Sequence, residues 1–376
     1  MIARVRYPLL ALGLLALVCG VWAGLLRFGW GLPRGRANLV ELHGPLLVFG
    51  FLGTVISLER AVALRRVWGY LAPAGSLAGV ALLLAGVRKG VGELVLLLAG
   101  CVLVALFGVI LRRHATAPGA TMALGALLWV AGDALWLGGK PFVQVVPWWV
   151  GFLVLTIVGE RLELAALARL TRLGRLAFAA LTMMFVAGLA LSAVDADDGT
   201  RLAGVALVGY ALWLGHFDIA RYTVRRPGLP RFVALALLPG YVWLAVGGTL
   251  WAVDGATVAG FAHDAGLHAI FVGFVFSMIF GHAPVIFPGV LGIDIPFRRA
   301  FYVHLALLHA GLVLRIGGDL SEDLALARRG GLLNAIAIGL FIVATLGSAA
   351  LARRARSAKR VPASARLRPP EVSRPR

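Results

Sequence analysis

Apolar runs recur along the whole chain, and each is long enough to cross a membrane as a helix. The hydrocarbon core of a bilayer is roughly 30 Å thick, which a helix of about 20 apolar residues spans. Only 14% of the residues are charged, whereas an ordinary soluble domain is about one quarter charged. We therefore predict an all-α polytopic membrane protein of about twelve transmembrane helices, near residues 8–26, 39–58, 69–87, 92–111, 119–139, 145–165, 176–194, 200–220, 230–252, 257–281, 300–317 and 331–351.

The basic residues are placed in a way that sets the expected orientation in the membrane. The formal net charge is +19, and the Lys and Arg residues gather in short loops after even-numbered spans and in the 353–376 segment. An excess of Lys and Arg marks cytoplasmic loops. The 27–36 loop, with three arginines, is the exception. We predict a transmembrane domain over 1–352 and a basic, disordered cytoplasmic tail over 353–376, with both termini cytoplasmic at a bacterial inner membrane and lipid rather than nucleic acid as partner.

A spaced pattern recurs in three of the spans. It reads GFLGTVISLER at 50–60, GFLVLTIVGER at 151–161 and GFVFSMIFGHA at 273–283. Gly, Phe, Leu and Ile are common in membrane helices and align by chance, but Glu-Arg is rare there, which favours a real repeat. The copies fall on spans 2, 6 and 10, four spans apart. They predict three four-helix units around a pseudo-threefold axis, with Glu59, Glu160 and His282 at the cytoplasmic ends.

Histidines are concentrated on spans 2, 10 and 11. Ionisable residues inside a bilayer are costly and usually functional. With a rise of about 1.5 Å per residue, His43 stands about 24 Å above Glu59 and His268 about 21 Å above His282. These two imidazoles are therefore expected at nearly one level on parallel helices. Two histidines that face each other from neighbouring helices can bind a haem iron from both sides, so His43 and His268 are the candidate cofactor ligands.

The remaining histidines of these spans are candidate metal ligands, and imidazole suits copper as well as haem iron. They are His263, His282, His304 and His309. Plainer roles compete: His282 could end its helix before Pro284, and His304 could be an interfacial residue. Glu41 and Asp264 could orient imidazoles by accepting hydrogen bonds. Asp133, within the fifth span, is either a proton-relay residue or a polar packing contact.

The segments HGPLLVFGF (43–51) and HAIFVGFVFSMIFGHAPVIFPG (268–289) resemble subunit I of the haem–copper oxidases. That family has twelve helices in three four-helix arcs and pairs histidines of helices 2 and 10 on a haem, roles that would fall on His43 and His268. The copper-binding histidines of helices 6 and 7 are missing, and so is the His-x-His pair of helix 10. The resemblance therefore implies an oxidase-like frame without an oxygen-reducing centre.

In length, single-domain form and the 268–289 pattern, the chain is more similar to the NnrS-like family. These are bacterial membrane proteins that contain haem and copper and are linked to nitric oxide metabolism and nitrosative stress. The resemblance implies haem, with copper as a second metal, a role in nitric oxide response or electron transfer, and respiratory or denitrification membrane proteins as partners. Whether the chain is an enzyme stays open. The competing hypotheses are a twelve-helix transporter of a small molecule or metal ion, and an assembly partner that binds nothing itself.

Overall fold

The computed structural model describes residues 2–33, 39–167 and 170–359, which form helices and loops and contain no strand. Two of the membrane spans are built from three consecutive segments. The first comprises α2 (His43–Pro45), the π-helical η1 (Leu46–Gly53) and α3 (Thr54–Leu64), and the second α12 (Phe261–His268), the π-helical η3 (Ala269–Phe276) and α13 (Ser277–Leu291). The other helices are α1 (Ile2–Arg27), η2 (Val67–Tyr70) with α4 (Leu71–Leu84), α5 (Val91–Arg113), α6 (Ala117–Leu137), α7 (Phe142–Leu167), α8 (Arg172–Ser192), α9 (Ala196–Phe217), α10 (Ala220–Thr223), α11 (Leu229–Asp254), α14 (Phe301–Leu320) and α15 (Leu324–Lys359).

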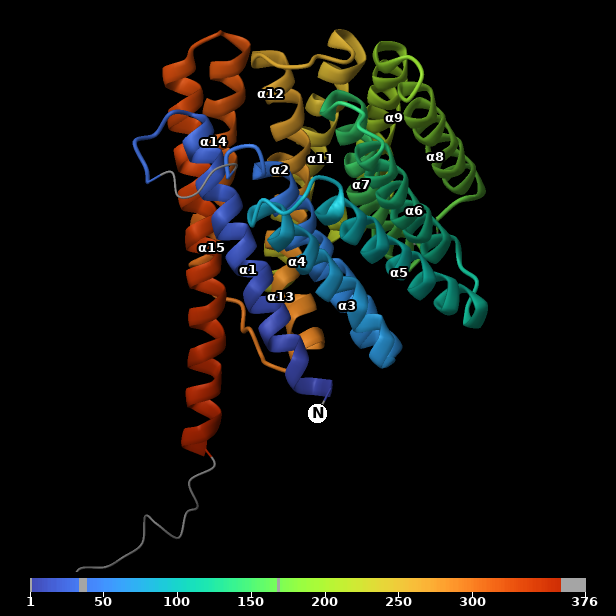
Figure 1. Cartoon of the computed structure of the whole chain (residues 1–376). Helices are drawn as coiled ribbons and strands as arrows, with labels where there is room; N and C mark the ends of the chain where they lie inside the picture. The colour runs from blue at the N-terminus through green and yellow to red at the C-terminus, as the bar shows by residue number, and fades with distance from the viewer. Residues whose placement is uncertain (1, 34–38, 168–169, 360–376) are drawn as a thin grey trace, which may run out of the picture.

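The helices form one bundle of long, apolar segments, and the prediction of an all-α multi-pass membrane protein is confirmed. Among the described residues, 11 helices are long and apolar enough to cross a membrane. The difference from the predicted twelve is α9, a helix of 22 residues that falls near the predicted 200–220 span. Asp197, Asp198 and Arg201 lie in its first two turns and lower its mean hydropathy. It packs between α8 and α11 in the bundle (Figure 1).

Three helices form the centre of the bundle, and they are the three that carry the repeated pattern. The central stretches of His43–Leu64, Phe142–Ala165 and Phe261–Leu291 are 61%, 72% and 67% buried, whereas the other spans range from 28% to 50%. We call them the three central helices. The α14–α15 pair lies at one edge of the bundle and the α8–α9 pair at the other (Figure 1). This is the arrangement expected if spans 2, 6 and 10 surround a pseudo-threefold axis.

Two helix ends differ from the sequence-based expectation. The α13 helix runs through Pro284 and Pro288 to Leu291, so His282 does not end its helix before the first proline. Prolines inside membrane helices are tolerated because neighbouring groups satisfy the freed backbone carbonyls. The α15 helix continues past residue 352 to Lys359 and extends beyond the rest of the bundle (Figure 1). The remainder of the predicted tail, 360–376, lies outside the described residues.

Candidate cofactor-binding site

His43 and His268 face each other across the interior of the bundle. Their ring centroids lie 6.4 Å apart, and the ring planes are inclined by 23°. His43 opens the second span, and His268 ends α12 directly before the π-helical η3. The prediction that these two imidazoles lie at one level on neighbouring helices is therefore confirmed.

Both imidazoles are fixed in the same protonation form by backbone carbonyls. The Nδ1 atom of His43 lies 2.7 Å from the carbonyl oxygen of Gly20, and that of His268 lies 2.8 Å from the carbonyl oxygen of Asp264. A carbonyl oxygen only accepts, so a neutral imidazole in this position carries its proton on Nδ1. Within the described residues neither Nε2 atom has a hydrogen-bond partner. Each ring therefore presents an Nε2 lone pair, the form in which histidine binds metals.

A glycine on α1 makes room for the ring of His43. A Cβ atom built on Gly24 would lie 2.7 Å from Cε1 and 3.0 Å from Nδ1 of that imidazole. Real Cβ atoms do not approach so closely, so any side chain here must push the ring aside. The same displacement would break the short bond from Nδ1 to Gly20.

We expect Gly24→Ala to weaken the binding of the candidate cofactor, haem, between His43 and His268 while the bundle stays folded. The added methyl group shifts the His43 ring and misaligns its Nε2 atom with that of His268. Ligand affinity of the purified variant, compared with wild type, measures the effect. Gly31→Ala is the matched control, since nothing lies within 4 Å of a Cβ atom built there; equal affinities in the two variants would contradict this role for Gly24.

The π-helical segments directly follow the two histidines. The η1 segment begins three residues after His43, and η3 begins one residue after His268. Such wide turns are rare and are found mostly at functional sites. Each segment contains a Gly-Phe pair, and the glycine allows close packing: a Cβ atom on Gly50 would lie 2.7 Å from that of Ala16. The two central helices thus depart from regular α-geometry at the level where their histidines meet.

Two adjoining cavities contain the histidine pair. The first has a volume of roughly 150 Å³ and a mainly apolar lining that includes Leu47, Trp149 and Phe271, and we call it the apolar cavity. The second has a volume of roughly 510 Å³ and a more polar lining, and we call it the polar cavity. Besides the pair, its charged or titratable lining residues are Arg27, Glu41, His263, Asp264, Arg315 and Asp319. Sites for small ligands usually occupy about 300–1,000 Å³ and combine apolar walls with a few polar groups. The polar cavity, at roughly 510 Å³, falls in this range, and the smaller apolar cavity opens beside it.

An ion pair lies beside His268 at the boundary of the two cavities. The Nε and NH2 groups of Arg315 donate to one carboxylate oxygen of Asp264 at 3.0 and 2.7 Å. The other oxygen of Asp264 lies 3.3 Å from Nδ1 of His268. The guanidinium group of Arg315 also stacks over the ring of Phe28, 4.4 Å from its centroid. The carboxylate of Asp264 therefore contacts His268, which follows it by four residues, and not the adjacent residue His263.

The other predicted metal ligands are dispersed. His263 lines the polar cavity. His309 accepts a hydrogen bond at Nδ1 from the indole N–H of Trp243 at 3.1 Å. His304 is 2% exposed and packs against Phe232, Phe280, Phe301 and Phe341. Among the described residues, no group of three or more His, Cys, Asp or Glu side chains is arranged to hold a metal ion.

His282 belongs to a second polar cluster at the far end of the central helices. Glu59, Glu160 and His282 line one cavity of roughly 80 Å³, so the prediction that these repeat positions share one end of the bundle is confirmed. Arg60 bridges the two carboxylates, at 2.5 Å from Glu160 and 3.6 Å from Glu59. The Glu-Arg motif thus joins two central helices through the arginine of one copy and the glutamate of the other.

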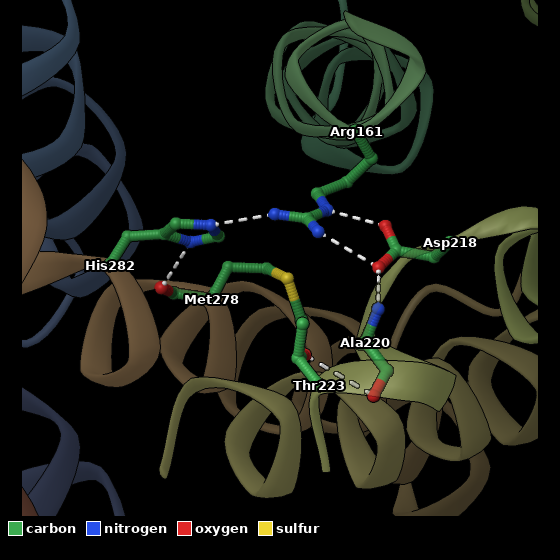
Figure 2. A network of polar contacts seen from close by, with 6 residues as sticks. All are labelled: Arg161, Asp218, Ala220, Thr223, Met278 and His282. Carbon is green, nitrogen blue, oxygen red and sulfur yellow. Dashed lines mark hydrogen bonds and ion pairs between the residues drawn. The ribbon is translucent and has the colours of Figure 1, made fainter. Parts of the chain in front are cut away.

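Arg161 joins α7 to two other parts of the chain in this cluster (Figure 2). Its Nε and NH2 groups donate to the two carboxylate oxygens of Asp218 at 2.6 and 2.8 Å. Its NH1 group lies 3.0 Å from Nε2 of His282, whose Nδ1 lies 2.8 Å from the carbonyl oxygen of Met278. Both ring nitrogens of His282 are therefore engaged, unlike those of His43 and His268. Asp218 also accepts from the N–H of Ala220 at 2.7 Å, which fixes the start of α10.

Asp133 is a packing residue next to the apolar cavity. Its carboxylate is fully buried and accepts hydrogen bonds from the indole N–H groups of Trp129 at 2.8 Å and Trp149 at 3.1 Å. Trp149 in turn lines both cavities around the histidine pair. Of the two readings of Asp133, this geometry favours the packing contact, because both of its bonds orient tryptophan side chains.

Residues 6–350 match the model of a family described as a domain of unknown function (DUF8744). The chain belongs to this family. The matched segment contains every residue of the histidine site and of the polar cluster at the far end. A comparison with curated proteins gives no match. The family description names no activity.

Some residues of the site leave little trace in the sequence. The pairing of Arg315 with Asp264 joins α14 to α12 across 51 residues, and that of Asp218 with Arg161 joins a loop to α7 across 57. A usable signal existed for Asp264, because its spacing of four residues places it one helical turn from His268. For Gly24 the signal was absent, since 48 glycines occur in the chain.

Proposed function

We propose that this chain is a bacterial inner-membrane haem protein in which His43 and His268 bind the iron from its two sides. The observation that carries the proposal is the facing pair of imidazoles, each with its Nδ1 proton held by a backbone carbonyl and its Nε2 lone pair unengaged within the described residues. The resemblance of the two histidine segments to the haem-binding helices of haem–copper oxidases supports the same assignment.

The spacing of the rings fits a metal ion between them. A metal–imidazole nitrogen bond is about 2.0 Å long. In a five-membered ring with C–N bonds of about 1.33 Å, each nitrogen lies roughly 1.1 Å from the ring centre. Two imidazoles that hold one ion in line would therefore have centroids about 6.2 Å apart. The observed separation of 6.4 Å is close to this value and supports the assignment.

The two cavities suit the two chemical halves of a haem. The apolar cavity, with Leu47, Trp149 and Phe271 in its walls, would take the macrocycle. Arg27, at the polar cavity, would pair with a carboxylate group of the haem. Haem would supply one-electron chemistry here. Because His43 and His268 would both hold the iron, the proposal favours electron transfer or a nitric oxide response over oxidase turnover.

The proposal also covers a copper ion, the orientation of the chain in the membrane and its protein partners. His282 is bonded at both ring nitrogens, His309 is bonded at Nδ1, and His304 packs among phenylalanine rings. A copper ion near the haem would therefore rely on His263, which lines the polar cavity. The basic loops favour cytoplasmic termini, which places the histidine pair toward the periplasm. Respiratory or denitrification membrane proteins are the partners that we propose, on the strength of the similarity to the NnrS-like family.

Element analysis and optical spectroscopy of the purified protein test this function. We expect about one iron per chain and a Soret band whose position changes on reduction with dithionite. Growth with added haem precursor ensures that loading is not limited by supply. A protein that is folded in detergent but contains neither iron nor a Soret band would overturn the proposal.

Transport is the second candidate function, and one observation favours it. The apolar cavity and the far-end cavity lie on the same central helices and share Leu52 as a lining residue. Phe51 and Phe276 stack between them, with centroids 6.3 Å apart. Two cavities on the same central helices, with an aromatic pair between them, would offer a transported ion a path with one constriction.

Uptake of copper or zinc ions into liposomes that contain the protein tests the transport reading. If the Phe51–Phe276 pair is the barrier, uptake should exceed that of empty liposomes and rise severalfold in Phe51→Ala. Phe185→Ala, at a fully buried aromatic of α8, is the matched control for loss of a phenyl ring. Uptake equal to empty liposomes in all three proteins would exclude metal-ion transport.

A further inference from the structure

The two histidines of the pair have different electrostatic surroundings. Nδ1 of His43 lies against a neutral partner, the carbonyl oxygen of Gly20. Nδ1 of His268 lies against the carbonyl oxygen of Asp264 and, at 3.3 Å, against a carboxylate oxygen of the same residue. Glu41, the acidic residue nearest to His43 in the sequence, is exposed and has no bond to that ring among the described residues. Within the described part of the chain, a charged group therefore directly contacts the ring of His268 but not the ring of His43.

The carboxylate beside His268 is held in place by Arg315. Two guanidinium nitrogens bond one oxygen of Asp264, which directs the other oxygen toward the imidazole. Arg315 is itself fixed: its side chain is 10% exposed, and its guanidinium group stacks over Phe28. The two charges come from α12 and α14, so the pair also joins these helices. The pair itself has no net charge, and Asp319 interacts with Asp264 as a further acidic side chain. The end of the pair that points at His268 is the negative one.

A carboxylate next to Nδ1–H makes a metal-bound imidazole a stronger electron donor. Such a ligand stabilises the oxidised, more positive iron and lowers the reduction potential, and hydrogen bonding around a ligand is one of the means by which proteins adjust haem potentials. Arg315 acts in the opposite sense, because a positive charge nearby disfavours the oxidised form. The two members of the pair are thus expected to have effects of opposite sign.

We propose that the Asp264–Arg315 pair is a positioning unit for His268 that sets the reduction potential of the site through the charge balance of its two members. The proposal rests on the proposed haem function and deepens it. Neither residue touches the iron in this scheme: Asp264 acts through the imidazole of His268, and Arg315 acts by orienting and neutralising Asp264.

Redox titration of purified Asp264→Asn and Arg315→Gln proteins, followed at the Soret band, tests the proposal. Asp264→Asn removes the negative charge and leaves Arg315 unbalanced, so the potential should rise. Arg315→Gln leaves Asp264 unbalanced, so the potential should fall. At a fixed ambient potential we expect each variant to change the ratio of oxidised to reduced haem at least tenfold, which corresponds to about 59 mV for one electron.

Two further variants separate charge from shape. Arg315→Lys keeps the positive charge but loses the two-pronged bond, and its potential should stay closer to wild type than that of Arg315→Gln. Glu41→Gln is the matched control, because it removes a negative charge from the same cavity without a bond to either histidine. It should leave the ratio within about twofold of wild type.

The outcomes distinguish this proposal from the one on which it rests. Wild-type protein without haem contradicts the proposed function itself. Wild-type protein with haem, combined with shifts of the same sign in Asp264→Asn and Arg315→Gln, shows that the pair only joins α12 to α14, and the proposal fails. It fails equally if the two variants bind haem with unchanged potentials, or if Glu41→Gln shifts the potential as much as Asp264→Asn does.

Discussion

His43→Ala and His268→Ala are each expected to abolish stable haem binding, and this is the largest effect that we predict for the site. Either change removes one of two axial ligands and leaves the other in a cavity whose remaining lining is mainly apolar. The other histidine that lines the polar cavity, His263, lies five residues before His268 and is therefore rotated from it by about 140° around the helix, so it cannot take the place of His268 without a rotation of α12. The Soret absorbance per chain should fall to background in both variants, or shift to that of a five-coordinate haem that is lost on gel filtration.

His309→Ala is the control for these variants. His309 is a half-buried histidine of the same bundle whose Nδ1 is bonded to the Trp243 indole, so its loss should leave the haem spectrum unchanged. Full haem retention in both His43→Ala and His268→Ala would place the ligands elsewhere. If His309→Ala also lost haem, general destabilisation would explain all three results.

Arg161→Ala is expected to destabilise the fold by about 3–5 kcal/mol, the usual cost of leaving one charge of a buried ion pair without its partner. The Arg161 and Asp218 side chains are 3% and 1% exposed, so solvent offers little compensation. The same substitution removes the bond to Nε2 of His282 and separates three parts of the chain, as Figure 2 shows. Unfolding in detergent, followed by tryptophan fluorescence, measures the loss.

Two comparisons make the Arg161 prediction specific. Arg201→Ala breaks an exposed pair with Asp197, in which the side chains are 40% and 54% exposed, and should cost no more than about 1 kcal/mol. The double change Arg161→Met with Asp218→Leu removes both buried charges and should recover much of the lost stability. If Arg161→Ala were no more costly than Arg201→Ala, the buried pair would not hold these segments together.

Depth along the membrane was predictable from the sequence because an α-helix rises by a constant amount per residue. Counting residues placed His43 level with His268, and the repeat placed Glu59, Glu160 and His282 at one end, where they line a common cavity. The long apolar runs likewise placed the spans. Only α9 is less hydropathic than the other predicted spans, because its first turns contain charged residues. Asp195 caps this helix, and Arg201 bonds Asp197 and the carbonyl oxygen of Val253.

The rotation of each helix about its axis, and the contacts that polar side chains make as a result, were not predictable in the same way. Whether Arg315 turns toward Asp264, or His309 toward Trp243, depends on how α14 is rotated against its neighbours, and apolar helices give little periodic signal for that. All four additional histidines were candidate metal ligands by residue type, although they were expected at different depths. Their contacts separate them: His282 bonds Arg161, and His304 packs among phenylalanines. Asp218 lies in a loop, where no helical periodicity indicates which residue its carboxylate contacts.

The π-helical segments also link the two ends of the molecule through helical phase. Successive residues of a helix are rotated by about 100°, so the extra residue of a wide turn reorients every side chain beyond it. If η1 relaxed to regular α-geometry, His43 could keep its place while Glu59, further along the same span, would turn away from Glu160. The same holds for η3 between His268 and His282. A change in winding at the histidine level is therefore transmitted as a rotation to the opposite membrane face.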